Sequence, residues 1–223
     1  MGLLERLELQ RELEAFFQVK RVAYLESHGQ LGKPALILQC MPAETVVIDL
    51  ATAKLAEALA AGGGPTAKEG WWDQFKARNR PNLTFDGVTS ARKQSPDEWA
   101  TEVHVDGHVA AGVWRFPSDN SNPSAQAVGV ADFYSQVFDD FAYLTRSIFE
   151  SAGYSGMVHM TCTLLRADLL PLVNEYGNVV VPASKRETLR WPNLAVASGA
   201  FAEAGKQMAD QFLRIYGRAA RRG

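Results

Sequence analysis

The pair Asp106-Gly107 constrains the fold of this chain most, because it stands between two segments that favour β-structure. Trp99–Val105 precedes the pair and His108–Phe116 follows it, and both segments are rich in β-branched and aromatic residues. A two-residue type I′ turn needs positive φ at both central positions, which Asp-Gly adopts readily. The sequence therefore predicts a β-hairpin at residues 99–116.

The length of the turn sets the register of this hairpin. A two-residue turn pairs Val103 with Ala110, and it places His104 and His108 on opposite faces of the sheet. These two histidines, with Asp106 between them, form the only compact group of metal-ligand residue types in the sequence. A shared ion would need a bulge or a longer turn, so we predict no metal site.

Hydrophobic periodicity predicts the other elements. Helices are expected at residues 3–26, 51–61, 133–152 and 198–216. Strands are expected at residues 34–41, 83–89, 154–165 and 178–181, with 45–50 as an extension of the first and 185–194 as a linker or an edge strand.

Together these elements predict an α+β fold, with a mainly antiparallel sheet of about five or six strands flanked by helices. Residues 1–30 are expected to form an N-terminal amphipathic helix, and residues 31–223 a single α+β domain. The order of the elements is similar to that of GAF- or PAS-like sensors, which is an analogy of fold alone.

The composition bears on the size of the core, the attraction to nucleic acid, the state of the cysteines and the cellular location of the chain. Its 223 residues, 47% of them hydrophobic, are enough for a substantial core, and a net charge of −2 gives no general attraction to nucleic acid. Cys40 and Cys162 lie in apolar runs and are expected to be buried free thiols, with a disulfide as the alternative. Because no apolar run is long enough to span a membrane and the first residues are too charged for a signal peptide, we predict no membrane contact and a cytoplasmic location.

Small residues on the second hairpin strand suggest a binding surface. Ala110, Ala111 and Gly112 leave room above the sheet for a bulky group, either an aromatic side chain of a helix or a ligand. We predict a ligand site near Trp99, Trp114, Ala110 and Gly112. The first functional hypothesis is therefore a non-catalytic regulatory domain, without a cofactor, that senses a small molecule, binds a partner protein or self-associates.

A second hypothesis comes from the segment at residues 69–80. Trp71 and Trp72 stand beside Lys76, Arg78 and Arg80, and aromatic rings beside cations can stack bases and hold phosphates. The alternative is a segment whose tryptophans cover the sheet while its cations face solvent. The corresponding function is a nucleic-acid-associated module.

A third hypothesis is an enzyme whose site is assembled from residues far apart in the sequence, which leaves no local motif. The sequence has none of the common catalytic or metal-binding motifs. His159 and Cys162 are separated by an odd number of residues, so they point to opposite faces of the predicted strand. We therefore assign no catalytic residue.

Several stretches resemble a known family. They read PALILQCMP at residues 34–42, RPNLTFDG at 80–87, TEVHVDGHVAAGVW at 101–114 and FDDFAYLTRSIFESAGYSGMVHMTCTLL at 138–165. They are similar to the C-terminal region of bacterial proteins that carry a Schlafen AlbA-type DNA-binding domain in front, although this sequence does not contain the AlbA-like domain itself. The resemblance implies a regulatory role in transcription or defence and carries over no active-site residues.

Overall fold

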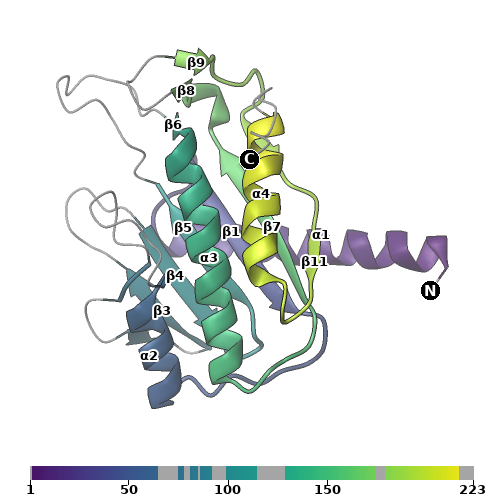
Figure 1. Ribbon diagram of the computed structural model, residues 1–223, viewed down its shortest axis with the longest axis vertical. Helices are drawn as coiled ribbons and strands as arrows, with labels where there is room; N and C mark the ends of the chain where they lie inside the picture. Colours follow the sequence, from purple (N-terminus) through teal and green to yellow (C-terminus); the bar gives the residue numbers. More distant parts are fainter. Residues whose placement is uncertain are drawn as a thin grey trace.

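The computed structural model describes residues 2–64, 75–77, 81–84, 86–91, 99–114, 129–173 and 179–215. It shows an α+β fold in which helices flank both faces of a large antiparallel sheet (Figure 1). The predicted fold class is confirmed, although the main sheet has eight strands and not five or six.

The main sheet has the strand order β10-β7-β1-β5-β4-β3-β2, with β11 also paired to β7, and every pairing is antiparallel. Its strands are β1 (Ala35–Pro42), β2 (Asn82–Leu83), β3 (Gly87–Ala91), β4 (Trp99–His104), β5 (Val109–Val113), β7 (Val158–Leu165), β10 (Thr188–Arg190) and β11 (Leu194–Val196). A second sheet has the order β6-β8-β9 and consists of β6 (Gly129–Val130), β8 (Leu172–Val173) and β9 (Val179–Val181).

Strand β1 lies in the middle of the main sheet, between β5 and β7. Its sequence, ALILQCMP, is almost continuously apolar, as expected for a strand that is covered on both faces. Seven of its eight residues are buried, and proline occurs only as the last residue, where the strand ends.

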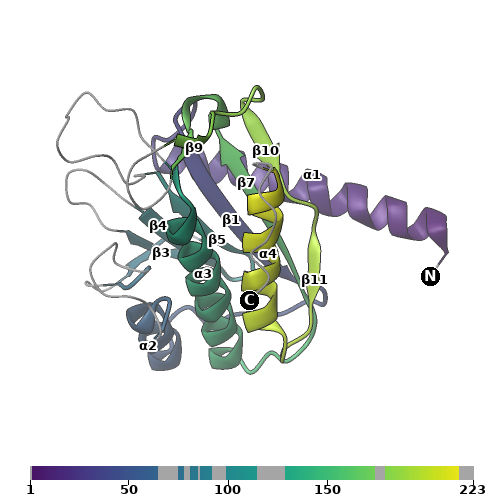
Figure 2. The ribbon, with the colours of Figure 1, turned by 45° about the horizontal axis from the view of Figure 1, so that its top comes forward.

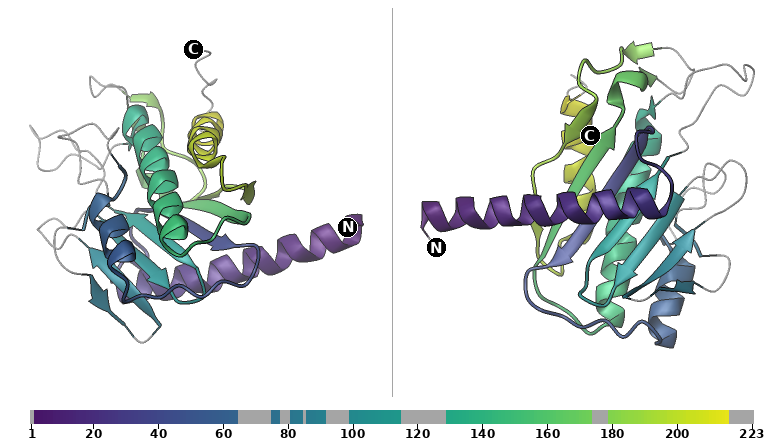
Figure 3. Two further views of the ribbon diagram at one scale, coloured as in Figure 1. Left: turned by 60° about the horizontal axis from the view of Figure 1, so that its bottom comes forward. Right: turned by 180° about the vertical axis from the view of Figure 1, so that it is seen from behind.

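The helices divide between the two faces of the sheet. Helices α2 (Ala53–Ala61), α3 (Ala131–Ser151) and α4 (Phe201–Ile215) cover one face, which is in front in Figure 1. Helix α1 (Leu3–Ser27) crosses the other face, as the view from behind in Figure 3 shows. A short 3-10 helix (Ala167–Leu169) follows β7.

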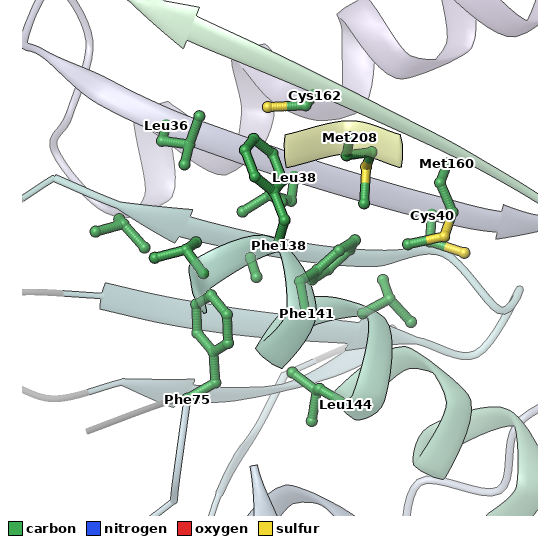
Figure 4. Packing of buried hydrophobic residues seen from close by; sticks show 14 of the residues in the cluster. Leu36, Leu38, Cys40, Phe75, Phe138, Phe141, Leu144, Met160, Cys162 and Met208 are labelled. Carbon is green, nitrogen blue, oxygen red and sulfur yellow. The ribbon is translucent and has the colours of Figure 1, made fainter. Parts of the chain in front are cut away.

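The main hydrophobic core lies between the sheet and α3 and α4. Figure 4 shows Phe138 and Phe141 of α3 among the inward side chains of β1 and β7, including Leu38, Cys40 and Cys162. These five residues are fully buried. Both cysteines are free, so the prediction of buried thiols is confirmed and the disulfide is not formed.

The hairpin forms where predicted, but its predicted register was wrong by one residue. Val103 pairs with Val109 and not with Ala110, because the turn contains three residues between His104 and His108. The backbone N–H of Gly107 donates to the carbonyl of His104 over 3.0 Å, and Gly107 has a φ of 84°. Such three-residue turns need a residue in the left-handed region, and glycine is the residue that adopts it without strain.

Two other strand predictions were also wrong. The segment 83–89 is not one strand, because it contains the end of β2 and the start of β3, which pair with each other antiparallel, with Leu83 opposite Val88. Residues 45–50 do not extend β1; they cross the end of the β4–β5 hairpin, where the N–H of Ile48 donates to the carbonyl of Val105 over 2.9 Å.

Helix α1 confirms the helix predicted at residues 3–26, and it is divided into two parts. Its second half packs on the sheet, where Phe17 and Tyr24 are buried. Its first half projects beyond the body of the molecule, as Figures 2 and 3 show, and all residues from 4 to 12 are exposed. The helix ends at Ser27, and Gly29 follows with a φ of 62°.

Candidate ligand-binding site

The face of the sheet beneath α1 is polar. It is formed by the alternate residues of the strands that do not point into the main core. Its polar side chains include Gln39 on β1, Glu102 and His104 on β4, His108 beside β5, Thr161 and Thr163 on β7 and Arg190 on β10. Helix α1 therefore covers a surface that can form hydrogen bonds.

The sheet-facing stripe of α1 is itself partly polar. It consists of Phe17, Arg21, Tyr24 and His28, at helical spacings of four, three and four residues. Tyr24 Oη donates to the carbonyl oxygen of Ala100 over 2.7 Å. Two aromatic rings and two polar groups thus hold the second half of α1 on the sheet.

A cleft of about 120 Å³ opens between α1 and the edge of the sheet formed by β7 and β10. It is lined by Glu14, Phe17, Gln18 and Arg21 of α1, by Thr161 and Thr163 of β7, and by Arg190, Trp191 and Asn193. Phe17, Arg21, Trp191 and the two threonines are buried, whereas Glu14, Gln18 and Arg190 are exposed. The cleft therefore has a buried floor and a solvent-facing rim.

Arg21 is the main charged group on the floor, with only 7% of its surface exposed. Its Nη1 donates to Thr163 Oγ1 over 2.9 Å. Burial, and then the nearby charge of Arg190, lower its pKa from the ordinary arginine value. Among the described residues, no carboxylate lies within ion-pair distance of this guanidinium.

Further hydrogen-bond donors lie at the same cleft. Within the described parts of the chain, Asn193 Nδ2 is buried and has no hydrogen-bond partner, whereas the Trp191 ring belongs to the main core, where it stacks on Phe212. The hydroxyl of Thr161 donates to the carbonyl of Trp191 over 3.2 Å. The lining is thus rich in donors and positive charge, and Glu14 on the rim is its one carboxylate.

A second polar group, the histidine cluster, lies under the second half of α1 and consists of His28, Glu102, His104 and His108. The Glu102 carboxylate lies 2.9 Å from His28 Nε2 and 3.2 Å from His104 Nε2. It also accepts a hydrogen bond from Ser27 Oγ over 3.0 Å. Glu102 therefore joins the end of α1 to strand β4.

The pKa values in the histidine cluster follow from these contacts. Burial alone would raise the pKa of Glu102, but hydrogen bonds from His104, His28 and Ser27 lower it to about 2. The hydrogen bond to Glu102 raises the pKa of His104. Burial, and then the charges of His104 and Lys20, lower the pKa of His108 to about 3. His108 is therefore a neutral side chain across the physiological pH range.

The longer hairpin turn brings His104 and His108 to the same face, with ring centroids 5.3 Å apart. The prediction that they lie on opposite faces was wrong for this reason. Even so, no group of three or more metal-ligand side chains suited to an ion occurs in the part of the chain that the structure describes.

The four residues predicted to bind a ligand do not share one face of the sheet. Trp99 is buried in the main core, where its ring packs edge-on against Phe75. Ala110, Gly112 and Trp114 lie on the α1 face. A Cβ atom added to Gly112 would lie 2.7 Å from Tyr24 Oη, so a helix aromatic fills the space above it, which was one of the two predicted alternatives.

The residues predicted to contact nucleic acid fall largely outside the described residues. Trp71, Trp72, Arg78 and Arg80 belong to this group. Lys76 is partly exposed and follows Phe75, which is buried in the main core. The nucleic-acid hypothesis stays a prediction.

His159 and Cys162 lie on opposite faces of β7, as predicted. His159 is on the α1 face, paired across the strands with Met41 and Ala195, whereas Cys162 is in the main core. Burial raises the pKa of the Cys162 thiol well above its ordinary value. This thiol is therefore not available as a thiolate nucleophile.

The sequence reasoning missed the cleft because its residues come from three distant segments. Arg21 and Thr163, which share a hydrogen bond, are 142 residues apart. One signal was present in the sequence: Arg21 occupies a position in an otherwise largely aromatic stripe of α1, where a charged residue needs a partner.

Comparison of the sequence with known protein families, with curated proteins and with solved structures finds no match. Among the described residues, none of the helices combines the length and the apolar composition needed to cross a lipid bilayer.

Proposed function

We propose that this chain is a non-catalytic sensing domain that binds a small molecule in the cleft between α1 and the sheet. The observation that carries this proposal is the construction of the cleft. One wall is α1, from Glu14 to Arg21, and the other is the sheet edge at β7 and β10. An occupant would contact both walls at once.

A ligand that contacts both walls stabilises the packed position of α1. Binding to the folded state adds free energy in proportion to the logarithm of ligand concentration over Kd. Besides the packing of its buried apolar side chains, the polar contacts that hold α1 without ligand are Tyr24 to the Ala100 carbonyl, Arg21 to Thr163, Ser27 and His28 to Glu102, Lys20 to Asp106, and the Gln39 amide to the Phe17 carbonyl. A ligand that bridges the cleft adds to this set, so the stability of the packed position of α1 is the property through which its binding would be read.

The projecting half of α1 is the part that could transmit this change. Its exposed side chains include Leu4, Leu7 and Leu9, with 75%, 45% and 38% of their surfaces accessible. Exposed leucines on a helix that extends from the body are suited to contact with a partner protein or a second copy of the chain. In this proposal, ligand binding controls how firmly the projecting half is held.

The side chains of the cleft favour binding over catalysis. Arginine stays protonated in proteins and neither accepts nor releases a proton at neutral pH. Threonine and asparagine supply hydrogen bonds that orient a ligand. The one side chain of the lining suited to proton transfer is Glu14, which lies on the exposed rim.

Hydrogen-exchange mass spectrometry tests this function without assuming the chemistry of the ligand. The protein is purified under native conditions, and exchange is compared before and after bound small molecules are removed by extensive dialysis. We expect residues 14–28 to exchange faster after dialysis, and re-addition of the dialysed metabolite fraction to restore protection.

Helix α3, which packs on the other face, serves as the internal control. Its exchange should stay the same in both samples, because none of its residues lines the cleft. Equal exchange of residues 14–28 with and without the metabolite fraction would contradict the sensing function.

A further inference from the structure

We infer that the ligand of this cleft carries an oxyanion group, a carboxylate or a phosphate, held between Arg21 and Arg190. The inference depends on the proposed function only in taking the cleft as the ligand site. It adds the chemical class of the ligand, which the sensing function leaves open.

The first argument is the burial of a charge without its counterion. A buried guanidinium is costly unless a negative group is close to it. Arg21 is more than nine-tenths buried, and its one hydrogen bond within the described residues is to a neutral hydroxyl. An arginine has five N–H donors, so most of the donors of Arg21 have no acceptor among the described residues.

The second argument is the presence of another cation beside the first. Arg190 lines the same cleft from strand β10, and its charge lowers the pKa of Arg21. The two positive charges repel each other, whereas an anion bound between them attracts both. Guanidinium groups bind carboxylate and phosphate through paired, charge-assisted hydrogen bonds.

The third argument is a neutral donor beside the two arginines. Asn193 lines the cleft, and its buried Nδ2 has no partner among the described residues. Donors without acceptors are what an oxyanion satisfies, because each of its oxygens accepts more than one hydrogen bond. A cationic ligand would find one carboxylate here, Glu14, and two arginines that repel it.

Glu14 places a further condition on the ligand. It lies on the exposed rim, about two helical turns from Arg21 on the same wall of the cleft. A second negative group extending from the floor to the rim would meet this carboxylate. The cleft therefore favours a ligand whose anionic group is at one end and whose other end is neutral or positive.

Nitrogen-15 NMR of the arginine side chains of the full chain tests the inference directly. The Nε–Hε signal of Arg21, assigned by its absence in Arg21→Lys, is followed during titration with butyrate, inorganic phosphate or butyramide at constant ionic strength. We expect a saturable shift with butyrate, with phosphate or with both. Butyramide, which has the shape of butyrate without its charge, should cause no shift.

Two variants identify the site. Arg190→Met removes a cation from the exposed rim and leaves the buried floor intact, so the protein should fold, and anion affinity should fall by about tenfold, typical of one charge-assisted hydrogen bond. Arg11→Met, on the projecting half of α1 and outside the cleft, is the matched control and should leave the affinity unchanged.

The outcomes separate the inference from the proposed function. A response to phosphate alone or to butyrate alone supports the inference and identifies which oxyanion the cleft prefers. The inference is overturned if neither anion gives a saturable shift of Arg21, if butyramide binds as well as butyrate, or if Arg190→Met binds as tightly as the wild type. If an anion binds but the exchange of residues 14–28 is unchanged, the oxyanion inference stands and the sensing function is rejected. If a neutral metabolite protects residues 14–28, the sensing function stands and the oxyanion inference is rejected.

Discussion

The two faces of the main sheet are made by alternate residues of the same strands, and they differ in almost every physical property. On β7, Met160, Cys162 and Leu164 enter the main core, whereas Thr161 and Thr163 face α1. The second hydrophobic cluster, under α1, contains six buried residues, Tyr24, Leu25, Ala35, Ile37, Ala100 and Ala110, and the main core contains several times as many.

In the proposed function, this difference separates stability from ligand recognition, because alternate residues of each strand face either the main core or α1. The apolar face, packed by α3 and α4, provides most of the free energy of folding through the burial of large side chains. The polar face contains groups whose desolvation is costly unless they are paired, and these are the groups that can select a ligand. A one-residue slip of any strand would exchange the two roles.

The largest expected effect concerns the apolar face. Phe141→Ala removes a fully buried ring from the main core, and we expect it to lower the free energy of unfolding by about 3–5 kcal/mol. Urea denaturation measures this loss, which should appear as one cooperative transition.

The matched variant on the other face is Phe17→Ala. It should loosen α1 while the near-ultraviolet circular dichroism of the main core persists. Global unfolding of this variant would contradict the separation of the two faces.

A second prediction concerns the acid sensitivity of the α1 face. The folded-state pKa of His108, about 3, lies below the ordinary histidine value of 6.5, so the unfolded chain binds a proton that the folded chain does not. Stability is therefore present above pH 6.5 and falls as the pH decreases towards 3, by roughly 2 kcal/mol between pH 6.5 and 4.5, as the slope approaches about 1.4 kcal/mol per pH unit.

Replacement of this histidine tests the assignment. His108→Leu, which keeps apolar contacts with Phe16 and Phe17, should remove most of the slope of unfolding free energy against pH in this interval. A smaller slope of the same sign should remain, because burial also lowers the pKa of His159. Glu102 loses its stabilising charge only below its ordinary pKa of 4.5, so it does not contribute above that pH. An unchanged slope in His108→Leu would place the acid sensitivity elsewhere.

The smallest expected effect is a local one at the contact between α1 and the sheet. Gly112→Ala would place a methyl group 2.7 Å from Tyr24 Oη and 2.8 Å from the Trp114 ring. We expect a loss of about 1–3 kcal/mol from this overpacking, and faster hydrogen exchange confined to the second half of α1. Gly199→Ala, where no atom lies within 4 Å of the added methyl group, is the control. Equal exchange rates in the two variants would show that Tyr24 does not limit the position of α1.

Much of the fold could be predicted from the sequence, because periodicity reports which side of an element is buried. The strand at residues 34–41, the alternation along 154–165 and the helix at 133–152 all follow from patterns within a few residues. The hairpin register did not follow, because an Asp-Gly pair occurs in both two-residue and three-residue turns. The N–H of His108 donates to Asp106 Oδ1 over 3.0 Å in the longer form, a contact that the sequence does not specify.

The candidate site was the least predictable part, for a related reason. Its residues come from α1, β7 and β10, and the order of strands in the sheet brings them together. Local patterns place Arg21 on the sheet-facing stripe of a helix, but they do not say which strand lies beneath it. The small residues at 110 and 112 lie on the same face of the sheet as the cleft, but Tyr24 takes the space above Gly112, and the cleft lies two strands away, at β7.

The central place of β1 has a consequence for the synthesis of this protein. Residues 35–42 pair on one side with residues 109–113 and on the other with residues 158–165. In a chain emerging from the ribosome, this strongly apolar strand therefore has no partner until β5 is translated, and it has a partner on one side only until β7 follows, more than a hundred residues after β1. Such delayed, long-range pairing slows folding and leaves an aggregation-prone apolar segment exposed during synthesis. We therefore expect β1 to be a segment of the nascent protein that chaperones bind.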